Sequence, residues 1–126
     1  MKTRSSYRIS RNSLCAVVLL LGFASAEANT VRIFSLSADE WARPRSGAVI
    51  PELEAVRSAV RYWEQVTPGL IVIRHPGEDT GEIWAAELRD WLISLGVAAD
   101  YIRLRAGNQD ADEIDLLVGG RDELEQ

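Results

Sequence analysis

Several residue types that carry chemistry are scarce in this sequence. It has one cysteine, Cys15, one histidine, His75, and one lysine, Lys2. A zinc site built from several histidines or cysteines is therefore excluded, and so is a disulfide within the chain. The glycine-containing stretch 77–82 lacks the lysine that phosphate-binding loops use. No Gly-x-Ser-x-Gly motif is present, which excludes a serine hydrolase of that type.

The remaining candidates for chemistry have plain structural interpretations. His75 follows an apolar run, so we expect it at the end of a strand with no catalytic role. Carboxylates crowd the stretch 110–115, but their spacing does not match a calcium loop, and we expect a solvated acidic hairpin loop. We therefore expect no metal, no cofactor and no catalytic residue. The crowded carboxylates are Asp110, Asp112, Glu113 and Asp115.

Residues 1–26 have the three-part layout of a secretory signal peptide. A basic start precedes the apolar run 14–23, and a small-x-small site at 24–26 makes Glu27 the expected first mature residue. Cleavage after Ala28 is an alternative, and retention as an anchor is a weaker one, because the run is about half the ~20 residues that span a bilayer. Cys15 lies too early for lipidation. We expect export to the periplasm, without stable membrane insertion after cleavage.

Removal of residues 1–26 leaves 100 residues with 10 basic and 19 acidic side chains, a net charge of −9. This balance argues against nucleic acid and against anionic membrane surfaces, because both attract basic patches. A chain of this length suits one small domain with a single core. We therefore expect one domain over residues 27–126.

The first half of this domain alternates strand and helix patterns. Residues 31–36 are rich in β-branched and aromatic side chains and predict a strand. Residues 37–50 show no period and predict a long connection. Pro51 is predicted to open a helix, and the continuous apolar run 70–73 predicts a strand that is buried on both faces. The apolar stripe of the helix is Leu53, Val56, Val60 and Trp63.

The second half continues the alternation. Residues 82–95 predict a helix, and Gly96 is placed to end it. Residues 101–105 and 114–118 predict two further strands, and residues 121–126 predict a solvated tail. The inner face of the helix is expected to be Ile83 or Trp84, with Leu88, Trp91, Leu92 and Leu95.

The order strand-helix-strand-helix-strand-strand predicts an α/β fold, a two-layer sandwich. Strands that are joined through a helix in one sheet run parallel, because the crossover is nearly always right-handed. The last two strands, joined by a short loop, are expected to pair antiparallel. The two helices would then cover one face of a mixed sheet.

Three segments carry a likeness to a known module. "IFSLSADEW" is residues 33–41, "AVRSAVRYWEQVTPGLIVIRH" is residues 55–75, and "AELRDWLISLGVAADYIRL" is residues 86–104. Together they resemble the OmpA-like C-terminal domain, a periplasmic module that holds peptidoglycan. The likeness implies that residues 27–126 form a single OmpA-like α/β domain.

The binding residues of that family have no counterpart in this sequence. In the family, an aspartate and an arginine hold the charged ends of a diamino acid. The positions that match them are Gly77 and Trp84. A zwitterion whose two ion partners are missing is rejected strongly, because its charges go unpaired. We therefore regard the likeness as degenerate and do not expect peptidoglycan to bind.

The tryptophans give the only candidate for a partner surface. Trp63 and Trp91 lie on the apolar stripes and are expected in the core. Trp41 and Trp84 are less determined, and Trp41 has two arginines close by in the sequence. Aromatic residues and arginines anchor protein interfaces, although Trp41 could equally fold over the core beneath arginine stems. The residues of the possible partner surface are Trp41, Arg43, Arg45 and Trp84.

The leading hypothesis is an exported, non-enzymatic binding or assembly protein of the bacterial envelope, accessory to a larger complex. Its expected partner is another envelope protein. Two alternatives stay open. One is a peptidoglycan-binding module with a relocated site. The other is a small periplasmic hydrolase that uses paired carboxylates, although no acidic residue has a recognisable partner.

Overall fold

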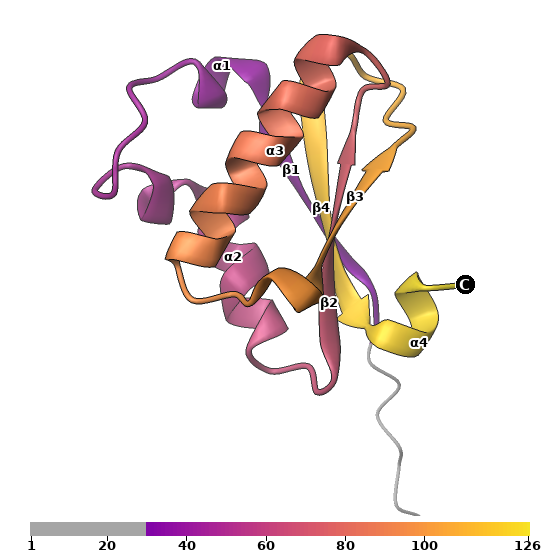
Figure 1. Ribbon diagram of the computed structural model, residues 1–126. Coiled ribbons are helices and arrows are strands. Elements are labelled where there is room, and N and C mark those ends of the chain that lie inside the picture. The colour runs from indigo at the N-terminus through magenta and orange to yellow at the C-terminus, as the bar shows by residue number, and fades with distance from the viewer. Residues whose placement is uncertain (1–29) are drawn as a thin grey trace, which may run out of the picture.

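The computed structural model describes residues 30–126, and the predicted signal peptide lies outside them. The chain forms a two-layer α/β fold, as predicted (Figure 1). No helix within these described residues has both the length and the apolar character needed to cross a membrane. The strands are β1 (Arg32–Ser37), β2 (Gly69–His75), β3 (Ile102–Ala106) and β4 (Glu113–Gly120), and the α-helices are α1 (Ala38–Trp41), α2 (Glu54–Trp63), α3 (Asp79–Ser94) and α4 (Arg121–Leu124).

The four strands form one mixed sheet in the order β1-β4-β2-β3. Strands β2 and β3 are parallel, whereas β4 is antiparallel to both β1 and β2. The predicted mixed sheet is confirmed, but the predicted pairing of the last two strands is wrong, because β2 separates them. Strand β4 suits the centre of the sheet because nearly all of its residues are buried, with apolar side chains on both faces.

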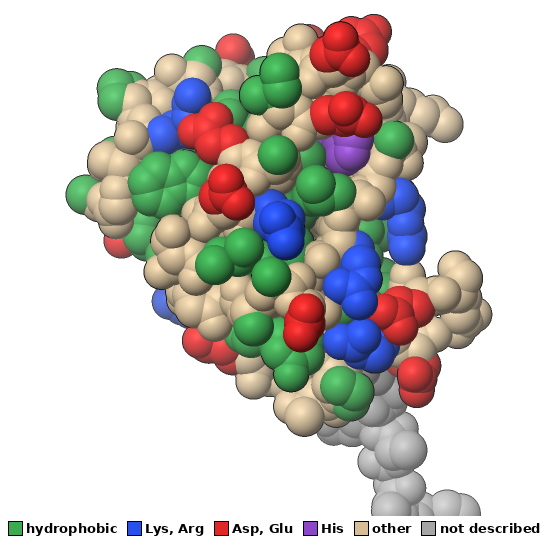
Figure 2. Space-filling model, viewed as in Figure 1, with side chains coloured by type: hydrophobic (Ala, Val, Ile, Leu, Met, Phe, Trp, Pro, Cys, Tyr) green, Lys and Arg blue, Asp and Glu red, His purple; other side chains and the backbone are tan. Residues whose placement is uncertain are grey.

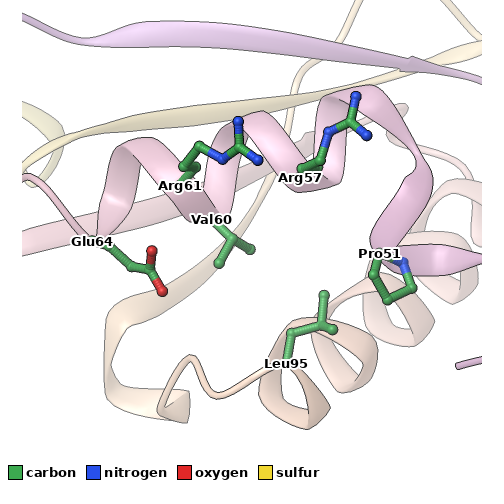
Figure 3. Close-up of a pocket in the computed structure, with 6 residues that line it drawn as sticks. All are labelled: Pro51, Arg57, Val60, Arg61, Glu64 and Leu95. Atoms are coloured by element: carbon green, nitrogen blue, oxygen red, sulfur yellow. The ribbon is translucent and has the colours of Figure 1, made fainter. Parts of the chain in front are cut away.

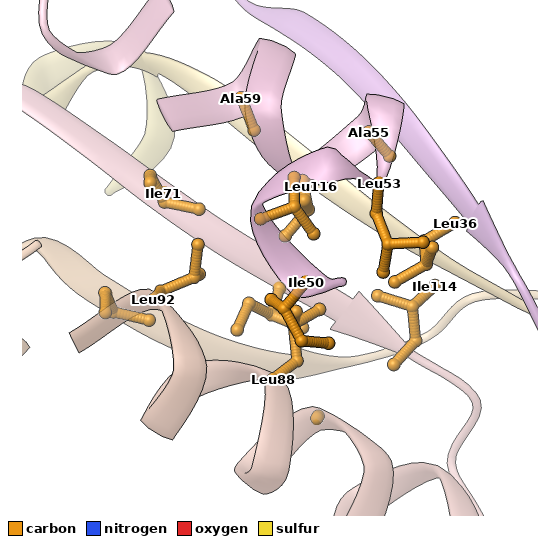
Figure 4. Packing of buried hydrophobic residues seen from close by; sticks show 14 of the residues in the cluster. Leu36, Ile50, Leu53, Ala55, Ala59, Ile71, Leu88, Leu92, Ile114 and Leu116 are labelled. Carbon is orange, nitrogen blue, oxygen red and sulfur yellow. The ribbon is translucent and has the colours of Figure 1, made fainter. Parts of the chain in front are cut away.

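Helices α2 and α3 cover one face of the sheet, as predicted, and the main core lies between them and the strands (Figure 4). Alternate residues of each strand point into it, for example Ile71 and Ile73 of β2. Helix α3 contributes Leu88 and Leu92, both fully buried. Further core residues are Leu36, Ile50, Leu53, Val56, Ala59, Ile102, Ile114, Leu116 and Val118.

The first long helix begins later than predicted. Pro51 lies in a short 3₁₀ turn, Ile50–Glu52. Leu53 then has extended backbone, with φ −61° and ψ 122°, and α2 starts at Glu54. The extended residue turns the Leu53 side chain into the core, where it is 6% exposed. Burial of this one side chain therefore interrupts the helix that Pro51 was expected to open.

Helix α3 begins at Asp79, three residues before the predicted start, and ends where the sequence indicated. Gly81 makes the early start possible, because a Cβ at this position would lie 2.2 Å from the carbonyl oxygen of Pro76. At the other end Gly96 has φ 101°. The N–H of Val97 donates to the carbonyl of Leu92 at 3.1 Å, which completes a Schellman motif.

The connection 37–50 contains a short helix that the sequence analysis missed. Ser37 caps α1 by accepting a hydrogen bond from the N–H of Glu40, and the Glu40 carboxylate accepts from the N–H and the hydroxyl of Ser37. These hydrogen bonds hold the pKa of Glu40 below its ordinary value. The letters "SADE" are a capping-box pattern, so the signal was present in the sequence.

The predicted solvated tail is also wrong. Residues 121–124 form α4, which lies against the sheet on the face opposite α2 and α3 (Figure 1). Leu124 is buried there beside Leu70, Val72 and Leu117. One apolar residue in a charged segment was too weak a signal to predict a buried helix. Leu124 is buried because this face of β2 and β4 is apolar.

Candidate functional site

The two tryptophans of the expected partner surface meet inside the protein. Trp41 of α1 and Trp84 of α3 stack with ring centroids 6.1 Å apart and planes 26° apart. Each is only 7% exposed. The contact fixes the connection 37–50 against α3. Both rings are therefore core residues, which favours the alternative of burial that the sequence left open for each of them over the possible partner surface.

The arginines of that surface lie outside this stack. The guanidinium of Arg45 lies 4.9 Å from the centroid of the Trp41 ring. It donates to the carbonyl of Trp41 and forms an ion pair with Glu87 of α3, both at 2.7 Å. Arg43 is exposed. This matches the alternative in which Trp41 folds over the core beneath an arginine stem, and Glu87 is the partner that the sequence did not reveal.

The two tryptophans expected in the core lie at its margin instead. Trp63 and Trp91 are half-buried and pack against the cluster without closing it. Trp63 contacts the ring of Tyr101 at 5.6 Å between centroids. The two tryptophans that were expected in the core are thus less buried than the two whose place the sequence left open. The apolar stripes of the sequence placed both side chains on the faces that point to the core. A stripe does not show, however, how deeply each of its residues is buried.

A groove lies between α2 and α3 (Figure 3). Its first hollow has a volume of about 210 Å³, with Val60 and Leu95 facing each other across an apolar floor. A second hollow of about 350 Å³ shares Glu64 with the first and is lined by Trp63 and Tyr101. We call the two hollows together the helix groove. The charged residues at its rim are Arg57, Arg61 and Glu64.

The charges around the groove do not form a field of one sign. Figure 2 shows acidic and basic side chains interspersed with hydrophobic ones on the face that α3 presents. An apolar floor with a mixed, charged rim resembles the composition of protein interfaces, in which a dry centre is surrounded by polar groups. Tyr101 is 36% exposed in this region. The sequence analysis did not single it out, because it reads as an ordinary strand residue.

The sequence likeness matched two positions, Gly77 and Trp84, to peptidoglycan anchors. Trp84 is buried in its stack with Trp41, so its side chain is not available to a ligand. Gly77 is exposed, with open space where a side chain would stand. The nearby first turn of α3 carries Asp79 and Glu82, which would repel a carboxylate.

The opposite face of the sheet carries a buried carboxylate that the sequence analysis assigned to a solvated loop. Asp115 lies on β4 and is 5% exposed. One of its oxygens accepts from the Ser35 hydroxyl at 2.6 Å, and the other accepts from the Arg74 guanidinium at 2.7 Å. Asn108 donates to it at 3.3 Å. The four side chains link the three neighbouring strands β1, β4 and β2 with the loop before β4.

Burial of Asp115 opposes its ionisation and is the largest single influence on it. The hydrogen bonds from Ser35 and Arg74, together with the positive charge of Arg74, outweigh burial and hold the pKa of Asp115 below its ordinary value. The carboxylate is therefore ionised at neutral pH and serves as a structural acceptor. Arg74 keeps its Nε buried without a partner.

This cluster predicts a specific loss of stability in acid. Because the folded pKa of Asp115 is depressed, its contribution is present above the unfolded pKa of about 3.9 and is lost as pH falls through the folded value. Asp115→Asn should lower the free energy of unfolding at pH 7 by about 2 kcal/mol. The difference between wild type and variant should shrink below pH 4. Urea unfolding across this range, with Asp90→Asn on the exposed face of α3 as control, measures it. A difference independent of pH would contradict the prediction.

The two other candidates from the sequence, the acidic stretch 110–115 and His75, do not form a site together. Asp110 accepts from the N–H of Asp112 at 2.9 Å, so it orders its own loop. His75 ends β2, as predicted, and is 4% exposed, with Nδ1 2.7 Å from the carbonyl oxygen of Pro76. Within residues 30–126, no three side chains of His, Cys, Asp or Glu are grouped closely enough to hold a metal ion.

Comparison of the chain with protein-family models, with curated proteins and with solved structures gave no match. The likeness to the OmpA-like C-terminal domain therefore stays a prediction from sequence. The structure establishes the fold class.

Proposed function

We propose that this chain is an exported, non-enzymatic binding or assembly protein of the bacterial envelope, with a degenerate OmpA-like fold. It acts in the periplasm and binds another envelope protein as an accessory part of a larger complex. The observation that carries the proposal is the helix groove, which combines an apolar floor with a rim of both charges. The export signal predicted in residues 1–26 supports the location.

The helix groove suits a protein segment better than a cell-wall peptide. Its floor is made by aliphatic and aromatic side chains, and Trp63 with Tyr101, whose rings are tilted by 55°, offers a large aromatic contact. Peptidoglycan recognition needs paired opposite charges, which the matched positions Gly77 and Trp84 do not supply. A second contact at Arg43 and Arg45, on the surface above Trp41, stays a prediction.

The test is a pull-down from envelope extract with the purified mature chain. We expect an envelope protein to co-purify with the wild type and to be lost with Tyr101→Glu, which places a charge in the apolar floor. Leu104→Glu is the matched control, because Leu104 is 44% exposed on β3 and lies outside the groove. Unfolding curves verify that both variants are folded.

Isolated sacculi are tested in parallel. We expect no retention of the wild type, with an intact OmpA-like domain as positive control. Saturable retention that free diamino acid competes would contradict the proposal and favour a relocated peptidoglycan site. Equal capture of the partner by Tyr101→Glu would show that the groove is not the binding surface.

A further inference from the structure

Strand β1 has a free edge. It pairs with β4 on one side and lies at the end of the sheet, so no strand within residues 30–126 pairs with its other side. The N–H of Ala38 points toward β4 and donates to the backbone carbonyl of Asp112. The N–H of Ser37 points the other way and donates to the Glu40 carboxylate. Because these directions alternate along an antiparallel pair, the N–H and C=O groups of Ile33 and Ser35 face outward.

This edge has little of the protection that edge strands usually carry. Charged side chains and prolines normally discourage a second strand from pairing there. Strand β3, at the other end of the sheet, carries Arg103 and Arg105, whereas β1 carries only Arg32 and no proline. Ile33 is 54% exposed beside the edge. An unprotected edge of this kind is a template for strand addition.

Two hollows line the gap between β1 and α2, and they share Phe34 and Ser58. The hollow of about 330 Å³ contains Glu40 and Glu54. The hollow of about 230 Å³ contains Arg32 and Arg61 together with Tyr62 and Gln65. The surface is therefore acidic on one side of its centre and basic on the other. We call it the β1/α2 surface.

The charges on α2 are available for an intermolecular contact. Glu54 stands at the first residue of α2 and Arg61 two turns later on the same side of the helix. No ion pair within the described residues involves either of them. Arg32 lies over the Tyr62 ring, 4.3 Å from its centroid, which holds it at the basic end. Ser58, a small residue, lies between the two charges and permits a close approach.

We propose that a second copy of this chain docks on the β1/α2 surface through a two-fold axis near Phe34 and Ser58. The two β1 strands pair antiparallel, with Ile33 of one copy opposite Ser35 of the other. The two four-stranded sheets then form one continuous sheet of eight strands. The acidic half of each copy meets the basic half of the other, and Glu54 lies opposite Arg61 of the second copy.

A second copy fits this surface because a two-fold contact requires one patch to be complementary to itself. Reversing the direction of β1 and α2 exchanges the Glu40 and Glu54 end with the Arg32 and Arg61 end. An unrelated strand would need its own matching order of charges. This self-association is separate from the binding of another envelope protein at the helix groove, and it is tested on the purified chain alone.

The test is the mass of the purified mature chain in solution, measured by sedimentation over a wide range of concentration. We expect the wild type to be a dimer. Glu54→Arg should raise the dissociation constant about a hundredfold, because two like-charge contacts replace two attractive ones. Arg61→Glu should do the same. The double variant, with both substitutions, should restore the dimer because it exchanges the two charges.

Matched controls change the same charges elsewhere. Asp90→Arg and Arg89→Glu lie on α3, outside the two hollows of this surface, and should leave the dimer unchanged. Ile33→Pro removes an outward N–H without removing a hydrogen bond to β4, so it should give a folded monomer. A wild-type monomer at every concentration overturns the proposal. So does a dimer that withstands both single reversals, or a double variant that stays monomeric.

Discussion

Gly81→Ala should destabilise the protein by about 3 kcal/mol, near the upper end of the cost of overpacking. The new methyl group would lie 2.2 Å from the carbonyl oxygen of Pro76 and 3.0 Å from its carbonyl carbon. These are backbone atoms of the residue that follows β2, so relief requires the first turn of α3 to move away from the sheet. Chemical denaturation of the wild type and the variant measures the loss.

Gly77→Ala is the matched control, because it lies four residues earlier and a Cβ there meets nothing within 4 Å. Its φ is not positive, so alanine fits the backbone. We expect a change within about 0.5 kcal/mol. Equal losses at the two positions would show that the contact with Pro76 does not fix the start of α3.

The second large effect is expected at Trp84. Trp84→Ala should lower the free energy of unfolding by about 4 kcal/mol, because a buried aromatic ring and its stack with Trp41 are lost together. The connection 37–50 should also loosen, since Trp41 and Arg45 pack through this contact. Denaturation measures the first effect, and hydrogen exchange in residues 38–50 measures the second.

Two variants separate the causes. Trp91→Ala removes a half-buried ring from the same helix and should cost clearly less. Trp84→Phe keeps an aromatic ring and removes the indole Nε1, which is buried without a partner. It should therefore cost much less than Trp84→Ala. A larger loss for Trp91→Ala than for Trp84→Ala would show that the stack of Trp84 with Trp41 is not the main aromatic contact of α3.

The sequence predicted the elements whose periods are strong. The run 70–73 predicted a buried strand, and Gly96 predicted the end of α3, because each depends on local chemistry. The position of β4 between β1 and β2 depends on pairing across about 80 residues with β1 and 41 to 51 residues with β2, which no local pattern encodes. Short helices such as α1 and α4 are also held by tertiary contacts and have little intrinsic stability.

The candidate sites were harder to predict for a related reason. Trp41 and Trp84 are distant in sequence, and their stack forms only because the connection 37–50 folds back on α3. The Arg74–Asp115 ion pair was hidden inside two apolar strands, where opposite charges were a signal that could have been used. The helix groove forms where α2, residues 66–69, Leu95 and Tyr101 come together, and none of these segments carries a signature of it.

The place of β4 has a consequence for the order of events during synthesis. Strand β1 leaves the ribosome early, but its one partner in the sheet is residues 113–118. Until that segment emerges, β1 and β2 have no strand between them. The core under α2 and α3 then lacks Ile114, Leu116 and Val118 of β4. The sheet therefore cannot be completed until the last strand has been synthesised. This order would suit the export that we propose, because a polypeptide that crosses a membrane unfolded must not complete its fold beforehand.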